Sequence, residues 1–215
     1  MSDHVKVPRR YDSTRRRDQA RQTRRAILEA ARRLFLERGY AGTTIGAVAD
    51  EAGVSVETVY KAFGNKARLV KEVFDFAIAG DDEPIPMLQR EMVARISAER
   101  DPRRKLQMYG EHLATAGPRA GSLQLLIRSA AASHPDAATV WDQMLTERLT
   151  GMTEFARHLH EGGFLRSGIS LDDARDVLWT YNSVELYELL VVQRAWDPER
   201  YGRWIAEAMI AALLD

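Results

Sequence analysis

Residues 43–66 read TTIGAVADEAGVSVETVYKAFGNK and carry the signals of two short helices joined by a tight turn. Thr44 is a good N-cap for the first helix, Gly53 ends it, and Ser55 is a good N-cap for the second. Helices separated by a few residues with a glycine form a helix-turn-helix, whose second helix enters the major groove of DNA. Apolar residues recur at helical spacing on the side expected to be buried: Ile45, Val48, Ala49, Val59 and Phe63.

The N-terminal residues of the second helix face base edges in such a motif, and here they point to Val56, Glu57 and Lys61. Val56 can meet a thymine methyl group, Glu57 can accept from cytosine N4, and Lys61 can reach guanine. Glu57 has a second interpretation, in which it only complements the positive end of its helix.

The charge distribution favours a polyanionic partner, although the formal net charge is +0. Residues 1–80 hold 16 Lys and Arg against 10 Asp and Glu, whereas residues 81–215 hold 15 against 21. A basic N-terminal part would turn toward phosphate, with an affinity that falls steeply with salt. The early arginines form either a solvated tail or an arm that enters the minor groove: Arg9, Arg10, Arg15, Arg16 and Arg17.

Composition excludes several other classes of protein. The chain has 215 residues, 45% of them hydrophobic, which is enough for one large or two small domains. It has no cysteine, and therefore no disulfide framework, thiolate metal site or cysteine nucleophile. Its first residues are polar and arginine-rich with no apolar stretch after them, and it has no long uncharged apolar run, so we expect a soluble, cytoplasmic protein associated with the nucleoid.

Helical periodicity extends through the chain without an alternating strand pattern, which predicts an all-α fold. Gly80 to Pro86 is rich in turn and acidic residues and predicts a domain boundary. Gly117 with Pro118 predicts a break between helices. The remaining helices are expected at 27–39, 66–79, 87–98, 102–116, 123–132, 135–161, 171–193 and 198–214.

Residues 24–70 resemble the DNA-binding domain of TetR-type transcriptional regulators. The joint spacing of many positions is specific, although any one of them alone would be weak. The residues that carry the resemblance are Ile27, Leu28, Ala30, Ala31, Leu34, Phe35, Gly39, Tyr40, Thr43, Thr44, Ala49, Ala52, Gly53, Val54, Ser55, Thr58, Val59, Tyr60, Phe63, Lys66 and Leu69.

The resemblance implies contacts to the DNA backbone at Thr44, Thr58, Tyr60 and Lys66. Lys66 lies at a helix start, where its ammonium and free N–H groups can converge on one phosphate. With Ser55 and the three base-facing residues, these positions make up the predicted DNA-binding surface.

The chain departs from its relatives where Ala47 replaces an acidic residue, Gly46 offers no side chain, and Ala62 replaces a larger one. The operator sequence therefore does not carry over.

Three domains are expected: a flexible basic arm over 1–17, a helix-turn-helix DNA-binding domain over 18–80, and a larger helical effector-binding and dimerisation domain over 81–215. In similar regulators the last domain holds a small effector, and the aromatic and methionine content here suggests a largely apolar one. Candidate pocket residues are polar or aromatic groups in apolar helices: Tyr109, His112, Arg128, Trp141, Met144, Arg148, Trp179, Tyr181, Asn182 and Glu185.

The last two helices are apolar on more than one side, which predicts a second neighbour for each. Similar regulators form homodimers through such a four-helix bundle and place two recognition helices on a palindromic operator. The expected interface residues are Leu178, Leu189, Trp204, Ile205, Ala208 and Met209. A dimeric repressor released by its effector is the expected function.

Two other classes of protein bear on the interpretation of this sequence. An enzyme is disfavoured because no phosphate loop, nucleophile elbow or metal-spaced cluster occurs, so no catalytic residue, cofactor or metal is expected. A structural or nucleoid-associated DNA-binding protein without an effector remains an alternative, because its DNA-binding domain would have the same sequence features.

Overall fold

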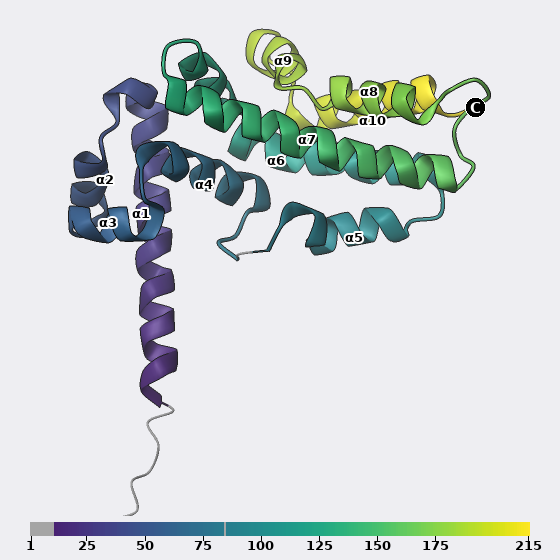
Figure 1. The fold of residues 1–215 in the computed structure, drawn as a ribbon. Coiled ribbons are helices and arrows are strands. Elements are labelled where there is room, and N and C mark those ends of the chain that lie inside the picture. Colours follow the sequence, from purple (N-terminus) through teal and green to yellow (C-terminus); the bar gives the residue numbers. More distant parts are fainter. Residues whose placement is uncertain (1–10, 84) are drawn as a thin grey trace, which may run out of the picture.

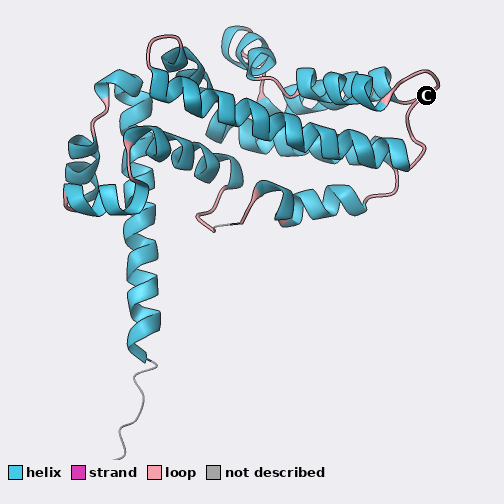
Figure 2. Ribbon diagram, viewed as in Figure 1, coloured by secondary structure: helices cyan, strands magenta, loops and turns pink. Residues whose placement is uncertain are grey.

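The computed structural model describes residues 11–83 and 85–215, and every regular element in that part of the chain is helical (Figures 1 and 2). The all-α prediction is therefore confirmed. The elements are α1 (Tyr11–Gly42), α2 (Ile45–Ala52), α3 (Val56–Phe63), α4 (Lys66–Ala79), the 3-10 turn η1 (Met87–Gln89), α5 (Glu91–Ala98), α6 (Pro102–Ala131), α7 (Pro135–Glu161), α8 (Leu171–Tyr181), α9 (Val184–Tyr187), the π-helical η2 (Glu188–Gln193) and α10 (Pro198–Leu213).

The first helix begins at Tyr11, inside the stretch 1–17 that was predicted to be a flexible basic arm. Positions 15–17 are exposed on this helix, whose first half projects beyond the rest of the molecule (Figure 1). Arg9 and Arg10 lie outside the described residues. The arginines at 15–17 therefore stand on a helix and not on an irregular tail.

The head is built from α1 to α4 and follows the predicted caps closely. The hydroxyl of Thr44 accepts from the Ala47 amide at 3.1 Å, and that of Ser55 accepts from the Thr58 amide at 3.2 Å. Gly53 ends α2 at φ 66°, a left-handed conformation that glycine adopts without steric cost. Local signals thus set both boundaries of the turn.

The apolar core of the head continues into α6 and α7. Phe35, Val70 and Phe74 from α1 and α4 belong to one buried cluster with Leu123 of α6 and Val140 of α7. A boundary at residue 80 divides the sequence, but the core passes across it. We refer to the elements from η1 to α10 as the body. Movement of α4 is consequently coupled to the body by direct packing.

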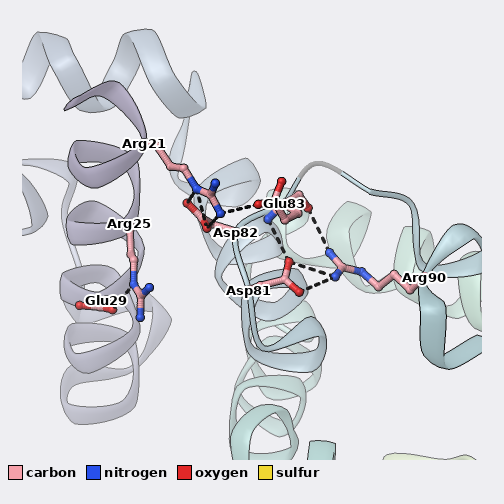
Figure 3. A network of polar contacts seen from close by, with 7 residues as sticks. All are labelled: Arg21, Arg25, Glu29, Asp81, Asp82, Glu83 and Arg90. Atoms are coloured by element: carbon pink, nitrogen blue, oxygen red, sulfur yellow. Dashed lines mark hydrogen bonds and ion pairs between the residues drawn. The ribbon is translucent and has the colours of Figure 1, made fainter. Parts of the chain in front are cut away.

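Ion pairs hold the segment after α4 against its neighbours (Figure 3). Arg21 of α1 bonds Asp82 at 3.1 Å and also Glu83, while Arg90 bonds Asp81 at 2.9 Å. Each pair has at least one partner at the surface, where ion pairs contribute little to stability. Their consequence here is mainly positional, because they tie α1 to the segment that precedes α5.

The predicted break at Gly117 and Pro118 is wrong, because α6 runs unbroken from Pro102 to Ala131. Pro118 is exposed, and the ring of Tyr187 lies against Gly117, where an added Cβ would come within 2.9 Å of the ring. The glycine therefore makes room for an aromatic neighbour and does not end the helix.

The helix predicted over 171–193 is in fact three pieces. α8 ends at Tyr181, Asn182 leaves the helical conformation, and a new helix starts at Val184 before the backbone widens into η2. Apolar periodicity could not reveal this, since the pattern continues through the break. Asn182, Ser183 and Val184, at the break itself, line the cavity described below.

Candidate functional site

One face of α3 is exposed and carries mixed chemistry. Val56 is 41% exposed and Tyr60 is 52% exposed, and Glu57 and Lys61 are exposed beside them. The opposite face of the helix is fully buried and holds α3 against the head. The predicted base-reading residues therefore share one accessible surface.

Two hydroxyls at the start of α3 serve its cap. The Ser55 hydroxyl is 2.9 Å from that of Thr58 as well as bonding its amide. Ser55 is exposed and Thr58 is half-buried. Both remain beside the open end of the helix, where backbone N–H groups attract anions.

Lys66 is less free than its sequence position suggests. Its ammonium donates to the Tyr40 carbonyl at 3.0 Å and lies 4.2 Å from the centre of the Tyr40 ring. The Tyr40 hydroxyl in turn donates to Asp136 at the start of α7. Burial, reinforced by the Asp136 carboxylate, raises the pKa of Tyr40. Lys66 thus joins the end of α1 to α4, and Tyr40 joins both to the body.

A cavity of about 460 Å³ lies among α4, η1, α5, α6, α7 and the α8–α9 break. Its size is within the ordinary range for small-molecule sites. The apolar wall includes residues that sequence reasoning missed: Phe74, Ile78, Met87, Met92, Ile96 and Phe155. Two of these come from α4, which the predicted domain boundary had assigned to the head alone. In the sequence, Met87 and Met92 were the features from which this part of the apolar wall could have been predicted.

Five of the ten predicted pocket residues line this cavity: Tyr109, His112, Met144, Arg148 and Asn182. Burial, with a smaller contribution from the charge of Arg119, lowers the pKa of His112 to about 4. Its imidazole is therefore neutral at pH 7.

Three other predicted pocket residues lie outside the cavity lining. Arg128 of α6 bonds Glu185 of α9 at 3.0 Å and also bonds Glu188. Arg128 and Glu185 therefore neutralise each other's charge. Trp141 packs half-buried against the core shared by head and body. Placing these three in the pocket was therefore wrong.

The last two of the ten are also excluded from the lining. The Trp179 ring is covered by the guanidinium of Arg148, 4.3 Å from its centre. Tyr181 packs edge-on against Trp204, with ring centres 6.1 Å apart. Neither ring lines the cavity, because Trp179 packs against Arg148 and Tyr181 packs against Trp204.

The predicted interface residues divide into two sets. Leu178, Ile205 and Met209 are fully buried in the chain's own core, so they offer no surface to a partner, and their assignment is corrected. Leu189 is 49% exposed, and Trp204 and Ala208 are half-buried. Of the six predicted residues, only this second set remains available, on α10 and at the start of η2.

Residues 27–73 match the family model described as bacterial regulatory proteins, tetR family. This stretch of the chain is therefore a TetR-type domain. The match covers nearly the same residues as the resemblance predicted from sequence, and it identifies α2 and α3 as a TetR-type helix-turn-helix.

Curated TetR-type relatives agree. The chain is 44% identical over 61 residues to the HTH-type transcriptional regulator TtgR of Pseudomonas putida, covering 28% of this chain and 29% of TtgR. It is 29% identical over 197 residues to the HTH-type transcriptional regulator CymR of the same species, covering 89% of this chain and 91% of CymR. The stronger identity is therefore confined to less than a third of TtgR.

The TetR-type fold extends to the body. The transcriptional regulator FadR from Bacillus subtilis, solved in complex with stearoyl-CoA, superposes with a TM-score of 0.68 at 19% identity, covering 87% of this chain and 97% of that one. At this identity the likeness concerns the fold. Within the described residues, no helix is long and apolar enough to span a membrane.

Proposed function

We propose that the chain is a dimeric transcriptional repressor that binds a palindromic operator and is released by a small, largely apolar effector in the cavity. It would act at the nucleoid, in the cytoplasm. The TetR-type head supports the DNA-binding part of this proposal, and the apolar cavity supports the effector.

The observation that carries the proposal is that α4 serves both sites. Its N-terminal residues Leu69 and Val70 are fully buried in the core of the head, while Phe74 and Ile78 line the cavity. A ligand that displaces the C-terminal half of α4 would therefore shift the support of α3.

An ion-pair network between α4 and α7 strengthens this coupling. Lys71 of α4 bonds Asp75 at 2.7 Å and Glu147 of α7 at 2.9 Å. Burial alone would lower the pKa of Lys71, but the two carboxylates outweigh it and the pKa is raised. An effector that favours one arrangement of α4 by about 1–3 kcal/mol would change operator affinity roughly 5- to 150-fold.

On DNA, Val56, Glu57 and Lys61 would face the bases. The phosphate contacts would come from residues at helix starts and from one tyrosine: Thr44, Ser55, Thr58, Tyr60 and Lys66. This arrangement relies more on the backbone than on many base hydrogen bonds, since Val56 offers only an apolar contact.

Dimerisation would use the exposed remainder of the predicted surface. Leu189 shares η2 with Val192, which is 56% exposed and apolar, while Trp204 and Ala208 lie on α10. A two-fold axis through α10 would place the two copies of α3 about 34–36 Å apart, one turn of DNA.

The test is DNA binding followed by effector titration. Selection from random duplexes should yield a palindrome, and sedimentation of the protein should show a dimer that Ala208→Arg weakens. Exposed Ala41→Arg is the matched control, because Ala41 lies at the end of α1, outside the proposed interface. Anisotropy should then show operator release by a cavity ligand. Operator affinity that is unchanged at saturating ligand would leave an effector-independent DNA-binding protein.

A further inference from the structure

Arg148 of α7 is a cavity residue whose guanidinium lacks an adequate partner among the described residues. Its Nε is buried without a hydrogen bond, and its Nη1 is 3.4 Å from the Asn182 carbonyl, which is long for such a bond. The Trp179 face supports it on one side. Burial lowers its pKa, although an arginine stays charged.

Two further hydrogen-bond donors of the cavity wall, Tyr109 and Asn182, form one corner of the cavity with Arg148. They also lack a good acceptor. Within the part of the chain that the structure describes, the buried Tyr109 hydroxyl and the Asn182 amide nitrogen have only the Met152 sulfur as an acceptor, at 3.8 Å and 3.9 Å. A thioether is a weak acceptor. The corner therefore combines a cation and two neutral donors around a site that lacks a good acceptor.

The acidic residues of the cavity wall cannot fill this role, because they already have cations of their own. Asp75 and Glu147 share Lys71, and Glu154 pairs with Arg157. The positive charge of Arg148 thus remains uncompensated inside the lining.

The nearest acidic neighbour of this corner outside the lining is also engaged. Glu185 contributes to the electrostatic environment of Arg148 but bonds Arg128 at 3.0 Å. Polar and charged groups removed from water are normally paired, so the half-buried guanidinium with its unbonded, buried Nε suits an anionic ligand.

We propose that the ligand of this cavity is an amphipathic carboxylic acid. Its carboxylate binds Arg148, Tyr109 and Asn182, while its apolar part packs against the apolar wall. The proposal rests on the proposed function of the cavity as an effector site. A carboxylate supplies two oxygens that match the planar guanidinium and can accept from both neutral donors. A neutral ligand would bury the guanidinium further and leave it unpaired.

Calorimetric titration of the full-length protein without DNA tests this. The probes are the straight-chain acids from hexanoate to tetradecanoate and naphthalene-2-carboxylate, each compared with its primary amide. At least one acid should bind, and about 10-fold or more tighter than its amide. Arg148→Met should abolish that preference, whereas Arg157→Met on the same helix should keep it.

Three outcomes would overturn the proposal: no acid binding at millimolar concentration, amides binding as tightly as acids, or a preference that survives in Arg148→Met. If Arg148→Met fails to fold, the acid–amide comparison on the unaltered protein still decides. Operator release by a neutral compound alone would defeat this inference and leave the proposed function standing. Acids that bind with the expected preference but leave operator affinity unchanged would do the reverse.

Discussion

Gly110 of α6 and Gly202 of α10 lie backbone against backbone, and a Cβ on either residue would overlap the carbonyl oxygen of the other. The added Cβ on Gly202 would also come within 2.9 Å of the Ala114 Cβ. Neither obstacle is a flexible side-chain end. Because both helices build the core behind the cavity, this crossing sets how closely the body can pack.

Gly202→Ala should therefore lower the free energy of unfolding by about 3 kcal/mol, the upper part of the range for overpacking. Urea denaturation followed by circular dichroism measures it. Gly151→Ala is the matched control, since a Cβ there meets nothing within 4 Å and alanine favours a helix interior by up to about 1 kcal/mol. Equal effects at the two positions would show that the crossing tolerates a wider spacing.

Tyr40→Phe tests the link between head and body. The substitution removes only the hydroxyl that donates to Asp136, and charge-assisted bonds contribute about 1.5–3 kcal/mol. Thermal unfolding should show a loss of about this size. Tyr60→Phe removes the hydroxyl of an exposed residue and should leave the midpoint unchanged. An unaltered midpoint in Tyr40→Phe would mean that ring packing alone holds the link.

His112 should make stability dependent on pH. In the unfolded chain its imidazole takes up a proton near the ordinary pKa of 6.5, but in the folded protein only near 4. Between these values the unfolded state binds more protons, so stability falls as the pH drops from 6.5 toward 4, by roughly 1–3 kcal/mol.

Denaturant midpoints measured across that range should fall less steeply in His112→Gln. Because carboxylates also titrate there, the informative quantity is the difference from the unaltered protein. The exposed His160 provides the control, and His160→Gln should follow the unaltered curve. Parallel curves for His112→Gln would place its imidazole in contact with solvent.

The head could be predicted almost residue by residue because its signals are local. Thr44 and Ser55 cap their helices as expected, since a cap depends on the residues within one turn of it. The body depends on partners distant in sequence. Gly117 suggests a helix end in the sequence, and only the structure shows the Tyr187 ring lying against it. Arg148 was expected in the pocket, but only the structure shows that its Nε has no hydrogen-bond partner among the described residues.

The same limit applies to the interface and the cavity. Ile205 and Ala208 sit on one helix, and both suited a contact with a second chain. Only packing shows that Ile205 is fully buried inside its own chain while Ala208 keeps exposed surface. Likewise, the periodicity of α4 marked Phe74 as buried but could not show that it faces a cavity.

Two lysines separate phosphate contact from base reading. Lys61 is exposed on α3, and Lys61→Ala should leave stability unchanged but relax preference at particular base pairs by about 1–3 kcal/mol. Lys66 holds the Tyr40 carbonyl with one donor and has others for phosphate. Lys66→Ala should weaken binding to all sequences alike and reduce the salt slope by about one per head, with a modest loss of stability.

Anisotropy at several salt concentrations, with specific and scrambled duplexes, distinguishes these roles. Affinities are compared at a temperature where both variants are fully folded, so that the stability lost in Lys66→Ala does not enter them. A change of base preference in Lys66→Ala, or its absence in Lys61→Ala, would move the reading surface away from the exposed side of α3. Because Lys66 also anchors Tyr40, a normal salt slope with lowered stability would assign it to the head–body link alone.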